Sequence, residues 1–159
     1  MDFRVGFGYD SHRFASDRPL VIGGVTIPYE LGLMAHSDGD VLLHAVCDAL
    51  LGAAGLKDIG TWFPDTDDAY KNADSTQLLA KVVEVVQGKG WVVNNLDCTL
   101  VLEKPKMKPY IDEIITKLSQ MLGAPTENIA VKAKTNEKMG FTGAGEGIAA
   151  VAAVTLRKM

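Results

Sequence analysis

Seven successive apolar residues near the C-terminus constrain the fold most strongly. Residues 148–154 contain only Ile, Ala and Val, within an uncharged run at residues 147–156. This run is well short of the roughly 18 to 20 residues that a membrane-spanning helix needs, and its composition favours a strand. A strand that is apolar on both faces does not suit a sheet with one side in water. We therefore expect helices on one face of its sheet and another copy of the chain on the other.

Other periodic patterns predict strands and helices in alternation. Alternating apolar residues indicate a strand over residues 3–9, and Gly23-Gly24 between two short apolar segments indicates a hairpin. The further expected elements are a helix at about residues 38–55 with Ser37 as N-cap, a helix from residues 74–77 to Gly88, a strand at 91–102, a helix from Pro109 to Gly123, and strands at 128–135 and 147–156. This order predicts an α+β fold with a mixed four-stranded sheet, helices on one face, and a single catalytic domain over residues 1–159.

Charge and composition exclude several classes of protein. With 47% hydrophobic and 23% charged residues, the chain can fill a core. A net charge of -4 argues against nucleic-acid and anionic-membrane partners. Asp2, Arg4 and Asp10 interrupt any apolar leader, so we expect a cytoplasmic protein. Cys47 and Cys98 are far apart in apolar surroundings, which favours buried structural thiols.

Two of the three histidines lie where a metal site can form. Asp10 and His12 are two residues apart just after the first expected strand, so in extended geometry both side chains leave the same face. His44 lies in the next helix, and these three donors would bind Zn²⁺ with a fourth position open, as in catalytic zinc sites. A single helical histidine is nevertheless more often a core residue than a ligand, so spacing alone leaves both interpretations open.

The helix that carries His44 has one polar side. Asp40, His44 and Asp48 recur every four residues among apolar neighbours and form one stripe. We expect this stripe to face the metal centre, with Asp48 holding the second ring nitrogen of His44. Alternatively, Ser37 and Asp40 act only as helix caps. His36 either faces solvent or meets an anion at the helix N-terminus.

Three loops carry polar residues whose roles the residue types leave open. Residues 58–68 are acidic, and turn formation explains them about as well as hydroxyl or metal binding does. Residues 104–108 contain three lysines, which suit either phosphate contact or a solvated loop. Glu137 follows the strand that carries Lys132 and Lys134, a position from which a carboxylate could hold Mg²⁺ or Mn²⁺ against a phosphate. Because no serine or cysteine has a histidine and carboxylate at suitable spacing, these features favour phosphoryl transfer by charge neutralisation.

Five segments together carry a more specific signal. They are GFGYDSHRF at residues 6–14, AHSDGD at 35–40 with His44, DIG at 58–60, FPDTD at 63–67 and TNEKMGFTG at 135–143. In this order they resemble the 2-C-methyl-D-erythritol 2,4-cyclodiphosphate synthases, and the match runs from residue 3 to the C-terminus. The AHSDGD and FPDTD blocks are highly specific to that family.

This resemblance implies an enzyme of the non-mevalonate route to isoprenoids. Its substrate would be 4-diphosphocytidyl-2-C-methyl-D-erythritol 2-phosphate, whose 2-phosphate attacks the β-phosphorus of its own cytidyl diphosphate. The cyclic diphosphate closes and CMP leaves. The nucleophile is then already an anion, which agrees with the absence of a protein base. The family also implies a homotrimer, with sheets packed around its axis and active sites between neighbouring subunits.

Residues that match a family motif take their roles from the resemblance. Zn²⁺ would be held by Asp10, His12 and His44, and Mg²⁺ or Mn²⁺ by Glu137. The catalytic residues would be His36 and Thr135, which donate hydrogen bonds to phosphate oxygens in the transition state. The loop at 102–108 would cradle cytosine through backbone groups, which replaces phosphate contact as its interpretation. The expected substrate-binding residues are Asp10, His12, His36, Ser37, Asp58, Ile59, Gly60, Phe63, Pro64, Asp65, Thr66, Asp67, Leu102, Glu103, Lys104, Pro105, Lys106, Met107, Lys108, Lys134, Thr135, Asn136, Glu137 and Phe141.

One position departs from the family pattern. Many members have Arg where this chain has Ala144, in a loop near the trimer axis that can hold an isoprenoid diphosphate. We therefore expect an apolar axial cavity built from Phe141 and the last strand, with weaker anion capture.

Two rival functions differ in their products. A metal-dependent phosphohydrolase would use a zinc-bound water as nucleophile and release inorganic phosphate or an opened diester. A non-catalytic trimeric scaffold would release nothing, and it would not need the four expected metal ligands.

Overall fold

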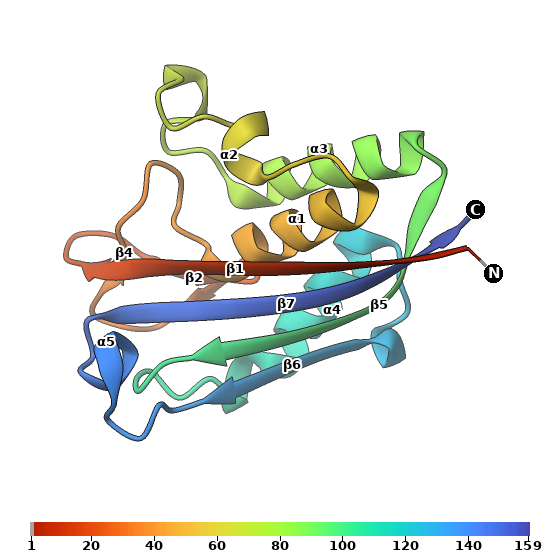
Figure 1. The fold of residues 1–159 in the computed structure, drawn as a ribbon. Helices are drawn as coiled ribbons and strands as arrows, with labels where there is room; N and C mark the ends of the chain where they lie inside the picture. Colours follow the sequence, from red (N-terminus) through yellow and green to blue (C-terminus); the bar gives the residue numbers. More distant parts are fainter. Residues whose placement is uncertain (1) are drawn as a thin grey trace.

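A mixed five-stranded sheet runs through the molecule (Figure 1), and the computed structural model describes residues 2–159. The strand order is β4-β1-β7-β5-β6, in which β5 and β6 are parallel and the other neighbours are antiparallel. Its strands are β4 (Gly32–Leu33), β1 (Phe3–Ala15), β7 (Gly147–Lys158), β5 (Trp91–Val101) and β6 (Ile129–Lys134). The helices are α1 (Val41–Ala54), α2 (Ile59–Trp62), α3 (Ser75–Gly88), α4 (Ile111–Leu122) and α5 (Gly140–Gly143), with short 3₁₀ turns η1 (Asp68–Tyr70), η2 (Lys108–Tyr110) and η3 (Thr126–Asn128).

The prediction of four strands is wrong, because β4 adds a fifth at the edge of the sheet. Residues Phe14 and Ala15 at the end of β1 pair with Leu33 and Gly32. A two-residue strand is too short to show a hydrophobic period. It forms because the chain after the hairpin returns alongside the end of β1, and pairing satisfies its backbone groups there.

The hairpin predicted at Gly23-Gly24 is confirmed. Strands β2 (Leu20–Ile22) and β3 (Val25–Ile27) form a separate two-stranded sheet, with Ile22 opposite Val25. Gly23 and Gly24 have φ angles of 63° and 76°. A two-residue turn with both central residues in the left-handed region suits two glycines.

Helix α1 lies directly against β1 because two glycines of that strand make room for it. The inward positions of β1 include Gly6 and Gly8, and a Cβ on Gly8 would lie 1.9 Å from the carbonyl oxygen of Ala45. Helix α4 packs on β6 on the same face, and α3 packs on α1 and α4. The close approach brings the side chains of α1 within reach of those at the far end of β1.

We expect Gly8→Ala to lower the free energy of unfolding by about 3 kcal/mol, since the added methyl group would overlap the backbone of α1 and force the two elements apart. Urea denaturation measures this change. Gly52→Ala is the matched control, because Gly52 is exposed on α1 with no atom within 4 Å of the added Cβ. That substitution should be neutral or stabilise the helix by up to about 1 kcal/mol. Equal stabilities for the two variants would contradict the close packing of α1 on β1.

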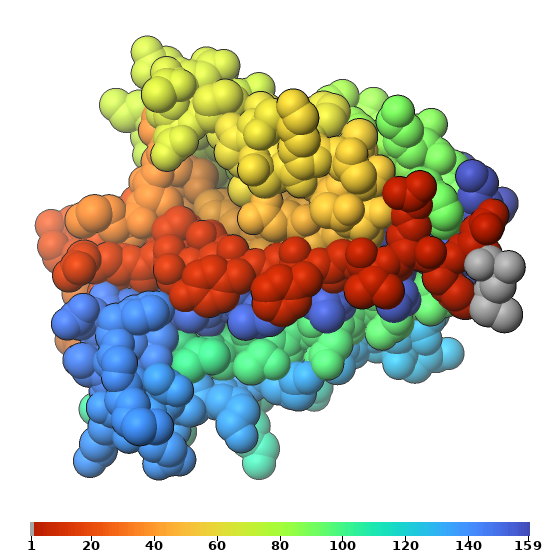
Figure 2. Space-filling view, viewed as in Figure 1, coloured from red at the N-terminus to blue at the C-terminus, as the bar shows by residue number. Residues whose placement is uncertain are grey.

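The other face of the sheet is not covered by helices. Outward side chains of β1 are large and apolar, and Phe3, Val5, Phe7 and Tyr9 are between 50% and 73% exposed. In Figure 2 the strand β1 crosses the front of the molecule with its side chains uncovered. The apolar outer face predicted for the last strand therefore extends onto its neighbour, and covering this face by another copy stays a prediction.

The two cysteines were predicted to be buried structural thiols. Cys47 and Cys98 are both buried and free of a disulfide, as predicted.

Within residues 2–159, none of the helices has the length and apolar character needed to cross a membrane.

Candidate active site

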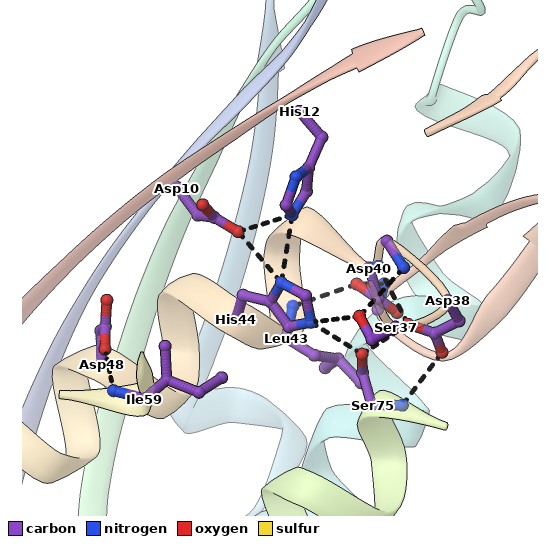
Figure 3. A network of polar contacts seen from close by, with 12 residues as sticks. Asp10, His12, Ser37, Asp38, Asp40, Leu43, His44, Asp48, Ile59 and Ser75 are labelled. Atoms are coloured by element: carbon purple, nitrogen blue, oxygen red, sulfur yellow. Dashed lines mark hydrogen bonds and ion pairs between the residues drawn. The ribbon is translucent and has the colours of Figure 1, made fainter. Parts of the chain in front are cut away.

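Strand β1 and helix α1 bring the three predicted metal ligands together. Gly6, Gly8, Asp10 and His12 occupy alternate positions of β1. The side chains of Asp10 and His12 therefore leave the face of the strand on which the two glycines lie. His44 comes from the first turns of α1, which lies on that face. Figure 3 shows the three side chains pointing toward one another.

The distances in this triad suit coordination of one ion. Asp10 Oδ2 lies 2.9 Å from His12 Nε2 and 3.1 Å from His44 Nδ1, and the two histidine nitrogens are 3.1 Å apart. One ligand atom from each residue falls within 4.8 Å of the others. One carboxylate oxygen and two imidazole nitrogens form a donor set typical of divalent metals such as zinc. The residues present therefore fit a divalent cation.

The charges of the triad favour cation binding. Burial by itself raises the pKa of Asp10, but hydrogen bonds to His12 and His44 and their positive charges outweigh it and lower that pKa to about 2. Burial lowers the pKa of His44, while the hydrogen bond and charge of Asp10 outweigh burial, so its pKa is raised. Asp10 is thus an anion over the physiological range and holds the proton or the cation that shares its site.

The second ring nitrogen of His44 has different partners from the one predicted. Nε2 lies 2.9 Å from Ser75 Oγ and 3.1 Å from Ser37 Oγ. Asp48 was predicted for this role, but its carboxylate instead accepts a hydrogen bond of 2.7 Å from the Ile59 backbone N–H. One helical turn beyond His44, Asp48 is placed to meet the start of α2 rather than the imidazole.

The helix that carries His44 starts later than predicted. Asp40 is the N-cap, so the prediction of Ser37 as the cap is wrong, and α1 begins at Val41 rather than near residue 38. The fully buried Asp40 carboxylate accepts from the backbone N–H of Leu43, Gly23 and Gly24. Burial outweighs these hydrogen bonds and raises the pKa of Asp40 to about 6. Asp40 therefore joins the hairpin turn to α1 and does not face the triad.

A cavity of about 330 Å³ opens beside the triad, large enough for a small phosphorylated ligand. Its wall is formed by Asp10, His12, Ala35, His36, Ser37, His44, Ile59, Gly60, Phe63, Asp65, Tyr70 and Leu78. Most of these were predicted, whereas Ala35, Tyr70 and Leu78 were not. Apolar residues of this kind carry no chemical signal in the sequence.

Two predicted binding residues serve as helix caps. Asp58 accepts from the backbone N–H and the hydroxyl of Thr61 at the start of α2, and these bonds lower its pKa. Asp67 caps η1 by accepting from the Ala69 N–H, and its carbonyl lies 3.2 Å from His36 Nε2. Turn formation, the alternative left open for this segment, is therefore one role of both carboxylates, and their contact with substrate stays a prediction.

Most of the remaining predicted residues line further cavities, whereas Pro64, Thr66 and Asn136 line neither these nor the cavity beside the triad. One cavity is lined by Leu102, Glu103, Pro105, Lys106, Met107, Lys108, Ile111, Ala133, Lys134 and Thr135. The next is lined by Glu103, Lys104, Thr135, Glu137, Lys138 and Gly143. The Lys138 backbone N–H donates to Glu103 Oε1 at 2.7 Å, which ties the loop after β6 to the loop after β5. Phe141 lines a third cavity with Ser11, His12, Arg13 and Glu146.

The pairing of residues across the sheet shows how far the triad lies from the strand that precedes Glu137. Asp10 pairs with Ala150, Ala150 with Leu100, and Leu100 with Ala133, so these four residues form one row across the sheet. Three strand spacings separate Asp10 from Ala133, or about 14 Å. The triad and the Glu137 loop therefore lie at the same end of the sheet but over different strands.

Comparison with known proteins gives one consistent result. Residues 3–157 match the model of the YgbB family. A 2-C-methyl-D-erythritol 2,4-cyclodiphosphate synthase from Bacillus cytotoxicus is 56% identical over 156 residues, which cover 98% of this chain and 99% of the relative. The bifunctional IspDF from Campylobacter jejuni superposes with a TM-score of 0.96 at 42% identity, over 99% of this chain and 43% of that longer chain. A CDP-bound form of 2C-methyl-D-erythritol-2,4-cyclodiphosphate synthase superposes with a TM-score of 0.89 at 38% identity, over 97% of this chain and 100% of the other.

Proposed function

Because this chain belongs to the YgbB family, we infer that it is a 2-C-methyl-D-erythritol 2,4-cyclodiphosphate synthase of the non-mevalonate route to isoprenoids. It converts 4-diphosphocytidyl-2-C-methyl-D-erythritol 2-phosphate into the 2,4-cyclodiphosphate and CMP. The observation that carries this conclusion beyond the family match is the triad, whose three donor atoms converge at the edge of a ligand-sized cavity.

We assign Zn²⁺ to Asp10, His12 and His44, and Mg²⁺ or Mn²⁺ to Glu137. The triad offers the oxygen and imidazole donors that zinc accepts, and a carboxylate beside phosphates suits the harder cation. When bound, the cations neutralise phosphate charge and make the β-phosphorus a better electrophile.

The residues of the chain bind and orient a substrate that brings its own nucleophile. The attacking group is the 2-phosphate, an anion that needs no base. His36 lies on the cavity wall beside the triad, and Thr135 borders both cavities on the far side. We assign both as hydrogen-bond donors to the phosphate oxygens, which take up negative charge as CMP leaves.

We assign the two ends of the substrate to different cavities, the erythritol end to the cavity beside the triad and the cytidine end to the cavity at residues 102–108. Residues 102–108 form a proline-shaped loop beside Lys134 and Thr135, which we assign to the cytidine and its phosphates. A CDP-bound relative with the same fold supports a cytidine nucleotide as the ligand. The erythritol end lies near Phe63 and Asp65, with hydroxyls near Ile59 and Gly60.

We propose a homotrimer in which each active site combines residues of two neighbouring subunits. The metals on adjacent phosphates must lie within a few ångströms of each other, yet about 14 Å of sheet separates the triad from the strand before Glu137. A second copy can bring its Glu137 loop to the triad. The uncovered apolar side chains of β1 supply the surface on which copies would associate.

A phosphorus NMR time course tests the function. The purified protein is treated with chelator and then given Zn²⁺ and Mg²⁺ together with the cytidyl diphosphate substrate. Metal-dependent appearance of CMP and a cyclic diphosphate is the expected result. Release of inorganic phosphate or an opened diester would identify a phosphohydrolase instead, and no change under any metal condition would favour a scaffold.

We expect Glu137→Ala to keep its zinc while losing stimulation by Mg²⁺ or Mn²⁺ and about 10²-fold in activity, because the second cation then has no carboxylate ligand. Metal analysis and the rate of CMP release at increasing Mg²⁺ measure both effects. Glu127→Ala is the matched control, since Glu127 is an exposed carboxylate at the opposite end of β6. Unchanged dependence on the divalent ion in Glu137→Ala would remove Glu137 from the site.

A further inference from the structure

The first residue of α3 is buried against the back of the metal centre. Ser75 is completely buried, although it begins a helix whose other end is exposed. Its backbone N–H donates to Asp38 Oδ2 at 3.0 Å, and its hydroxyl donates to Asp38 Oδ1. Its Oγ also lies 2.9 Å from His44 Nε2. Figure 3 shows Ser75 lying between Asp38 and His44.

The protons in this chain of contacts can be placed by counting donors. The Asp38 side chain takes three hydrogen bonds, from the Ser75 N–H, the Ser75 hydroxyl and the Asp40 N–H. A carboxylate only accepts, so the single hydroxyl proton of Ser75 is used on Asp38. Ser75 Oγ then offers a lone pair to His44, so a ring proton of His44 lies on Nε2. Its Nδ1 faces Asp10 and His12, where a bound cation would take the place of the proton that Nδ1 donates to the Asp10 carboxylate in the metal-free protein.

We propose that Asp38 and Ser75 are positioning residues that hold His44 as a metal ligand, an inference that rests on the proposed zinc site at the triad. They fix the tautomer in which Nδ1 is free to coordinate, and they fix the rotation of the ring toward Asp10. Hydrogen bonds of this kind to the remote nitrogen of a ligating histidine generally strengthen metal binding. Here the acceptor comes from α3, so a third element sets the geometry of a site built on β1 and α1.

Ser37 also contacts Nε2, but its role differs from that of Ser75. Its Oγ is 3.1 Å from the nitrogen and accepts from the Gly39 N–H, with no carboxylate behind it. The oxygen of Ser75 is closer, and donation to Asp38 makes it a stronger acceptor. The two serines therefore provide unequal support, which a comparison of variants can measure.

The experiment measures zinc affinity of the metal-free protein by competition with a chromogenic chelator, without substrate. Ser75→Ala should bind Zn²⁺ about 10- to 100-fold more weakly than the wild type, and Ser37→Ala should lose less. Thr76→Ala is the matched control, because the neighbouring Thr76 hydroxyl donates to Asp74, the cap residue of the same helix, and has no hydrogen bond to His44. It should bind zinc like the wild type.

The outcomes separate this inference from the proposed function. A wild-type protein that binds no zinc would overturn the zinc assignment itself. Zinc binding by the wild type with equal affinity in a folded Ser75→Ala would overturn the positioning role alone. If Ser75→Ala does not fold, nitrogen-15 NMR of the zinc-loaded wild type decides. The His44 ring, identified by its loss in His44→Gln, must have its proton on Nε2, and a proton on Nδ1 would contradict the proposal.

Discussion

His44→Ala is expected to abolish tight zinc binding and to slow CMP release about 10³-fold, while the fold and the proposed trimer persist. His44 supplies one of the three donors of the triad, and two donors no longer hold the ion against water. Loss of a cation that stabilises phosphate charge costs several kcal/mol of transition-state stabilisation, and each 1.36 kcal/mol is a factor of ten in rate. Metal analysis, the rate of CMP release and size-exclusion chromatography measure the three parts of this prediction.

Asp48→Asn is the matched control for this substitution. Asp48 lies one turn beyond His44 on the same helix, but its carboxylate contacts the Ile59 N–H, and an asparagine oxygen can accept the same hydrogen bond. We expect this variant to keep its zinc and its activity. A zinc-free His44→Ala with full activity would end the metal assignment.

Long elements of this fold were predictable because each has enough turns or residue pairs to show a period. Helix α3 begins directly after Asp74 and α4 ends at Gly123, as their cap residues indicated. Strand β4 and helices α2 and α5 were missed for the opposite reason. With two to four residues each, they exist through contacts with distant segments, as in the pairing of Leu33 with Phe14.

The predicted site shows where periodicity stops being informative. The four-residue spacing of Asp40, His44 and Asp48 predicted one polar stripe facing the metal centre, but of these three side chains only that of His44 reaches the triad. The Asp40 carboxylate accepts hydrogen bonds from the backbone N–H groups of the hairpin turn, and the Asp48 carboxylate accepts one from the N–H at the start of α2. Both partners are fixed by tertiary packing. Ser75 was missed because its contact with His44 joins residues 31 positions apart, and nothing in its own neighbourhood indicates it.

The proposed subunit arrangement leads to a second prediction with a large effect. His44→Ala and Glu137→Ala, each nearly inactive, should regain activity when the two chains are co-expressed and form mixed trimers. In a site built between neighbours, a Glu137→Ala chain supplies an intact triad and a His44→Ala chain supplies an intact Glu137. Random assembly of equal amounts makes such a pair in about one quarter of the sites. We therefore expect about one quarter of the wild-type rate of CMP release per site, against almost none for either variant alone.

A second mixture separates this arrangement from a site within one chain. Wild type is co-expressed in equal amount with the double variant His44→Ala/Glu137→Ala. Sites between subunits need two adjacent wild-type chains and leave about one quarter of the activity, whereas sites within a chain need only one and leave about one half. If each site lies within one chain, the mixture of His44→Ala and Glu137→Ala chains stays inactive. Equal activity of the two mixtures, about one quarter in each, would support a site shared between neighbouring subunits. An inactive first mixture beside a half-active second would place the whole site in one chain.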